Sequence, residues 1–176
     1  MKLPRTIRLD PSDEFVFPLA ASPGEWAVSG AFRFWDCDPA TLGGKERQAF
    51  RAGLLGIASF GWSTLVTVTE ATDEEIEEAT DSLARQLVTH MGAPDVAAAR
   101  AAAEEEIAFA ASLCDHPVNT LLAVQRSVED DGIRERFRTL KKREDMHTQA
   151  RAFEIVAEDD EEPDEQVDIK TIGHKQ

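Results

Sequence analysis

The 176-residue chain has no tyrosine and only two cysteines, Cys37 and Cys114. Two thiols far apart in a chain long enough to bury a core exclude a disulfide scaffold, and we expect both to stay reduced. No apolar run approaches the ~20 residues that a membrane span needs, and the first residues carry no secretory pattern. We therefore expect a cytoplasmic protein with no membrane partner.

Basic residues are also scarce. The chain has 19 Lys and Arg and 34 Asp and Glu, which gives a formal net charge of −15. Two segments, 70–81 and 157–168, together hold fifteen acidic residues and no Lys or Arg. Affinity for phosphate backbones comes mainly from Lys and Arg, so this balance argues against nucleic acid as a partner. Anionic membrane surfaces are disfavoured for the same reason.

Local motifs for catalysis, cofactors or metals are missing as well. The chain has no GxSxG elbow, no phosphate-binding glycine loop, no Rossmann fingerprint, and neither CxxC nor HxxxH spacing. Cys114 falls on the apolar stripe of a predicted helix, so we interpret it as a buried core thiol. We predict no metal and no cofactor, and a non-enzymatic role is favoured over an enzymatic one.

The N-terminal part of the sequence is typical of short strands. Segments 6–9 and 15–17 flank turn-forming residues and predict a small hairpin. Alternation of side chains over 26–35 predicts a longer strand. A helix is expected over 45–55, and a β-branched run predicts a buried strand over 63–69.

Two long helices are predicted in the middle of the chain. Thr72 and Glu75 have the spacing of a capping box and Gly92 supplies a stop, which predicts a helix over 73–91. The alanine-rich segment 96–114 predicts a second helix. Because the connection is short, we expect an antiparallel pair that covers one face of a sheet.

The C-terminal part returns to strand patterns. Segments 119–128 and 133–140 flank an Asp-Gly pair, which predicts a hairpin. A helix over 133–140 is the alternative, because its apolar residues also follow helical spacing. Residues 151–157 predict a last strand.

These elements predict an α+β fold, with a mainly antiparallel sheet of five to seven strands and a long antiparallel helix pair on one face. Residues 1–157 are expected to form a single domain. Residues 158–176 are expected to form an acidic tail.

A row of arginines is the first candidate binding feature. Arg134, Arg136 and Arg138 alternate along a predicted strand and would therefore share one face. Three neighbouring guanidinium groups repel one another unless a negative group meets them. That group is the acidic tail, the acidic helix of a second copy, or a phosphorylated or carboxylated ligand. A solvated face with loose surface ion pairs is the alternative.

The second candidate is a cleft near two tryptophans, formed by Trp35, Asp36, Cys37 and Trp62. Burial of the tryptophans in the core is the alternative, since each ring must cover a large area. We hypothesise a non-enzymatic accessory or interaction protein, a homodimer, whose acidic and basic surfaces meet a protein partner. An enzyme or small-molecule binder is the alternative, with an anionic ligand held between this cleft and the arginine row.

Three stretches carry a family resemblance: GEWAVSGAFRF at 24–34, FGWSTLV at 60–66 and ERFRTL at 135–140. The chain resembles a small family of uncharacterised bacterial cytosolic proteins of unknown function. The resemblance spans most of the chain and implies a bacterial cytosolic protein. It implies no activity, cofactor or site residue.

Overall fold

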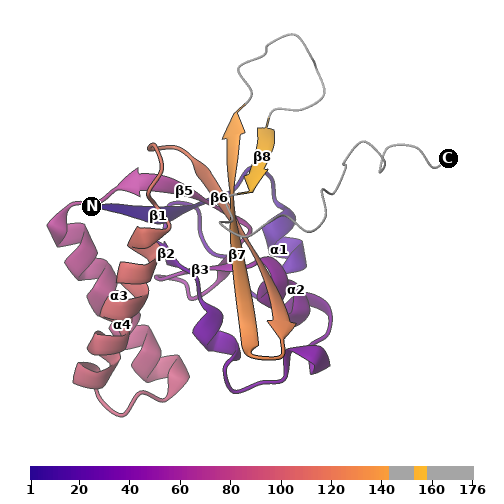
Figure 1. The fold of residues 1–176 in the computed structure, drawn as a ribbon. Coiled ribbons are helices and arrows are strands. Elements are labelled where there is room, and N and C mark those ends of the chain that lie inside the picture. Colours follow the sequence, from indigo (N-terminus) through magenta and orange to yellow (C-terminus); the bar gives the residue numbers. More distant parts are fainter. Residues whose placement is uncertain (143–152, 158–176) are drawn as a thin grey trace, which may run out of the picture.

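A five-stranded antiparallel sheet forms the centre of the molecule, in the strand order β1-β5-β6-β7-β8 (Figure 1). The structure, a computed structural model, describes residues 1–142 and 153–157, with side chains up to Leu140. The strands are β1 (Lys2–Ile7), β5 (Leu65–Glu70), β6 (Leu121–Glu129), β7 (Gly132–Lys142) and β8 (Phe153–Ala157). The predicted acidic tail, 158–176, lies outside the described residues.

The β6–β7 hairpin extends well beyond the rest of the sheet. Strand β5 pairs with β6 only at Val66–Leu122 and Thr67–Leu121, whereas β6 pairs with β7 along its whole length. Helix α2 (Gly44–Ala52) packs against β6 (Figure 1). The hairpin predicted here is thus confirmed over the helical alternative.

Helices α3 (Asp73–Met91) and α4 (Val96–Ser112) pack side by side (Figure 1). The predicted capping box between Thr72 and Glu75 opens α3, and Gly92, with φ of 68°, closes it. Helix α4 turns a narrow face of alanines toward the core and contacts β1 and β2 (Ala27–Val28). Small side chains allow this close approach, and the predicted α+β class with its helix pair is confirmed.

A second, three-stranded sheet corrects the prediction of a long strand over 26–35. Its order is β2-β3-β4, where β3 is Leu54–Gly56 and β4 is Trp62–Ser63. The chain leaves β2 at Gly30, whose φ is +81° and where an added Cβ would lie 2.6 Å from Leu55 Cβ. The backbone therefore turns into the 3-10 helix η1 (Ala31–Phe34), which buries Phe32 and Phe34.

The predicted hairpin of 6–9 with 15–17 is wrong. The backbone N–H of Ser12 donates to the Asp10 carboxylate at 2.8 Å and turns the chain into helix α1 (Ser12–Val16). The antiparallel partner of β1 is β5 instead. Helix α2 ends three residues earlier than predicted because β3 begins at Leu54, and a 3-10 turn, η2 (Pro39–Thr41), precedes it.

Buried side chains form two clusters. The larger one joins η1, α2, α3 and α4 around Phe34, Phe50 and Leu83, and the smaller one holds Val68 and Leu122 against β2 and β3. Among the described residues, no helix combines the length and apolar character needed to cross a membrane.

Candidate functional site

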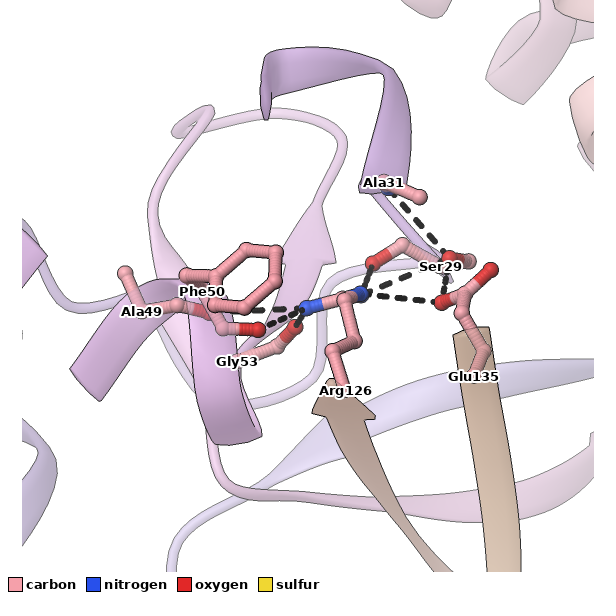
Figure 2. A network of polar contacts seen from close by, with 7 residues as sticks. All are labelled: Ser29, Ala31, Ala49, Phe50, Gly53, Arg126 and Glu135. Atoms are coloured by element: carbon pink, nitrogen blue, oxygen red, sulfur yellow. Dashed lines mark hydrogen bonds and ion pairs between the residues drawn. The ribbon is translucent and has the colours of Figure 1, made fainter. Parts of the chain in front are cut away.

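A fully buried arginine, Arg126 on β6, joins the hairpin to helix α2 (Figure 2). Its Nη1 donates to the carbonyl oxygens of Phe50 at 3.0 Å and Gly53 at 2.7 Å, with a longer contact to Ala49 at 3.4 Å. The last carbonyls of a helix lack intrahelical partners and carry partial negative charge. Arg126 thus satisfies the end of α2 and fixes it against β6.

The other side of the Arg126 guanidinium meets Glu135 and Ser29 (Figure 2). Arg126 Nε lies 2.9 Å from Glu135 Oε2, and its Nη2 donates to the Ser29 carbonyl oxygen. The Ser29 hydroxyl donates to the same Glu135 oxygen. Burial lowers the pKa of Arg126, and the Glu135 carboxylate opposes this shift. The network therefore holds β2, α2, β6 and β7 together at one point.

Sequence reasoning missed this network. Glu135 stood out only as the one acid within the arginine row, and Arg126 belonged to no pattern. The alternation Leu122, Val124, Arg126 along β6 was the available signal, because it places an arginine on the apolar face. A buried arginine needs a carboxylate or several carbonyls beside it.

The opposite face of the hairpin carries the arginine row. Its residues alternate along β7 with Glu135 and Phe137, whose ring packs against Phe109 of α4. Arg138 also lines a groove of about 370 Å³ with Gln48 and Arg51 of α2, and no acidic residue within 1–140 lines this groove. We call this surface the basic face, made of Arg51, Arg134, Arg136 and Arg138.

The basic face is incompletely neutralised by the described part of the chain. Arg134 pairs with Glu129 at 3.0 Å. Within residues 1–140, Arg51, Arg136 and Arg138 form no ion pair with a carboxylate. Strand β8 ends at Ala157, directly opposite Arg138.

Acidic side chains collect on the helix pair. Arg100 of α4 pairs with Glu77 of α3 at 2.6 Å and with Glu104 at 3.1 Å, and also contacts Asp81. The remaining acids of α3 include the exposed Glu74 and Glu78. We call this the acidic surface, and it lies on different elements from the basic face.

A cavity of about 400 Å³ lies between the end of η1 and the helix pair. Trp35 and Asp36 form one wall, Leu87, Met91 and Pro94 another, and α4 contributes three alanines with Glu105 and Glu106. Trp35 is 70% exposed although it contacts Phe32 edge-on. Among the side chains that the structure describes, the lining contains three carboxylates and no basic group.

Glu106 is the most perturbed acid of this cavity. Burial, aided by the charges of Glu135 and Glu105, raises its pKa from 4.5 to about 7, while the charge of Arg126 works in the opposite direction. No hydrogen bond joins its carboxylate to another described residue. Glu106 is therefore a partly buried carboxyl that titrates near neutrality beside an apolar space.

The structure separates the residues that the sequence grouped into one cleft. Trp62 is 4% exposed and stacks on Phe34 with ring centroids 5.3 Å apart, so it belongs to the core. Cys37 is exposed, its thiol donates to the Phe34 carbonyl, and it does not line the cavity. Trp35 and Asp36 do line it, whereas Arg138 lies in the other groove.

A metal site has no support in the described ranges, where no three His, Cys, Asp or Glu side chains gather suitably. No curated protein and no solved structure matches the chain. Residues 1–158 match the model of one family, described as "Family of unknown function (DUF6505)". The resemblance to a family of unknown function is thereby confirmed. With this match over nearly its whole length, the chain belongs to the family of unknown function DUF6505.

Proposed function

We propose that the protein is a non-enzymatic interaction protein whose basic face binds an acidic segment of a protein partner. The observation that carries the proposal is that Arg51, Arg136 and Arg138 have no carboxylate partner within residues 1–140, and that Arg51 and Arg138 line the same groove. Guanidinium groups form bidentate, charge-assisted hydrogen bonds with carboxylates, so a face of arginines favours a partner that presents acidic side chains.

The rigid support beneath the row favours binding over a solvated surface. Arg126 locks α2 to β6, and β6 pairs with β7, so Arg51 on α2 and Arg138 on β7 are held on elements that cannot separate freely. A positioned cluster loses less conformational entropy on binding than loose surface side chains do. The whole chain is negative and would repel an acidic partner at long range. Screening at physiological salt limits this repulsion to about 8 Å, so the positive charges of the basic face determine whether the partner binds there.

A second copy of the chain is one possible acidic partner, since each copy carries both a basic face and an acidic surface. In a two-fold dimer, the basic face of each copy would contact the acidic surface of the other. Sedimentation equilibrium at low and high salt tests this homodimer separately. If the protein is a monomer at all concentrations, the partner of the basic face is a different protein.

The experiment measures fluorescence anisotropy of a labelled oligoglutamate peptide with the full-length chain. We expect binding that weakens with salt and falls about tenfold or more in the Arg136→Glu/Arg138→Glu double variant. Lys45→Glu, an exposed change on α2 outside the groove, is the matched control and should have a much smaller effect.

Two further measurements test whether the acidic segment 158–168 competes for the basic face and whether the face prefers carboxylates to phosphates. A full-length variant with the acids of 158–168 replaced by Asn and Gln should bind the peptide more tightly if this segment competes for the face. A labelled single-stranded oligonucleotide should bind much more weakly than oligoglutamate. Equal binding of the oligonucleotide, or a double variant that binds like the wild type, would contradict the proposal.

A further inference from the structure

The cavity beside Trp35 carries a second inference, independent of the basic face. We propose that it binds a small organic cation, an ammonium group attached to an apolar body. The apolar body would lie against the alanines of α4, and the charged end would lie between the Trp35 ring and the Glu106 carboxylate. Three features of the cavity support this ligand class.

The first feature is shape and size. Its volume of about 400 Å³ lies within the range of small-molecule sites, which run from about 300 to 1,000 Å³. Ala98, Ala99 and Ala102 form a smooth wall on α4, and Leu87 and Met91 close it from α3. These side chains supply an apolar surface without filling the space.

The second feature is charge. Asp36, Glu105 and Glu106 are the only ionisable residues that the described part of the chain contributes to the lining, and Asp36 is distant in the sequence from the other two. A carboxylate or phosphate ligand would be repelled by these carboxylates, whereas an ammonium group would be attracted by Asp36 and Glu105, and by Glu106 once it has lost its proton. The anionic ligand expected near Trp35 and Asp36 from the sequence is therefore disfavoured at this cavity.

The third feature is the exposed ring of Trp35. A tryptophan that leaves 70% of its surface exposed forgoes most of the burial that normally stabilises it. The indole face is the strongest aromatic partner for a cation, and it lies in the same lining as the carboxylates. An ammonium ligand uses both groups at once.

The groups around Glu106 set how binding responds to pH. Burial, Glu135 on β7 and Glu105 on α4 disfavour its ionised form, and Arg126 on β6 favours it. Asp36 is the other carboxylate in the described lining of the cavity. A bound cation adds a further favourable charge. Affinity should therefore increase as pH rises through about 7, where Glu106 loses its proton.

The test compares three probes with the same phenyl body: 2-phenylethylammonium, 2-phenylethanol and 3-phenylpropionate. Ligand-detected NMR and Trp fluorescence measure binding to the full-length chain at pH values on either side of neutrality. We expect the ammonium probe to bind about tenfold more tightly than the alcohol, and the carboxylate probe not to bind.

Two variants locate the probe. Trp35→Ala, at an exposed position, should weaken ammonium binding without affecting the fold. Glu106→Gln should weaken it and abolish the pH dependence, while Glu78→Gln, an exposed change on α3, should do neither. Circular dichroism verifies that each variant is folded. Equal binding of the three probes, no ammonium binding at millimolar concentration, or wild-type behaviour of both variants would overturn the inference.

Discussion

Arg126 and Glu135 are direct cross-strand neighbours in the β6–β7 hairpin, and their side chains form an ion pair 2.9 Å long. The Arg126 side chain is buried, and its guanidinium also donates hydrogen bonds to the carbonyl oxygens at the end of α2. One residue further along β7, Arg136 points to the opposite face. The buried pair and the basic face thus share two strands.

Replacement of Arg126 by Met should destabilise the protein by about 3–5 kcal/mol, because Glu135 loses its cationic partner and four carbonyl oxygens lose the guanidinium donor. Urea denaturation measures this loss. Arg134→Met removes an exposed pair and should cost at most about 1 kcal/mol. Similar values for the two variants would show that the buried network contributes little.

Gly30→Ala should destabilise the fold by roughly 2–4 kcal/mol. The new Cβ would lie 2.6 Å from Leu55 Cβ and 2.9 Å from the Trp62 ring, at a φ of +81° that alanine avoids. Gly43→Ala is the matched control, since its Cβ would meet nothing within 4 Å. Thermal denaturation compares them, and a stable Gly30→Ala variant would refute this account of why η1 replaces the predicted strand.

Glu106 should make stability fall as pH rises from about 4.5 to about 7. In this window the unfolded chain has released the proton of residue 106 while the folded chain still holds it, so folding takes up a proton. Glu106→Gln should therefore gain roughly 1–3 kcal/mol relative to wild type between pH 4 and pH 8. Denaturation midpoints of both proteins across this range measure the difference, and Glu78→Gln should show none.

Only one thiol of the native chain should react rapidly with a disulfide reagent. Cys37 is exposed, whereas Cys114 is buried and burial raises its pKa to about 12. The Cys37→Ser variant should lack the fast phase. In the wild type, both thiols should react once the protein is unfolded. Two fast thiols in the native wild type would contradict the burial of Cys114.

The helix pair and the β6–β7 hairpin could be predicted because their signals are local. A capping box, a terminal glycine and an Asp-Gly turn specify structure within a few residues. The strand over 26–35 failed because its alternating aromatics suit a 3-10 turn equally well once Gly30 takes a positive φ. Leu55 and Trp62 leave no room for a side chain at Gly30, and no local pattern reveals that contact.

The candidate sites were predictable only in part, for the same reason. The shared face of Arg134, Arg136 and Arg138 follows from strand alternation, and the structure adds Arg51 from a helix far away in the sequence. Trp35 and Asp36 indicated a cleft, but its other walls come from α3 and α4. No sequence pattern distinguishes Glu106 from the other acidic residues, because its partial burial depends on the fold.

The central claim is that an acidic partner binds the basic face, and a map of the contact tests it most directly. Backbone amide spectra of the isotope-labelled full-length chain are recorded during titration with oligoglutamate. We predict perturbed resonances in β7 around Arg136 and Arg138 and in α2 around Arg51, with α3 and α4 unaffected. Perturbations elsewhere, or a spectrum that does not change, would contradict the account.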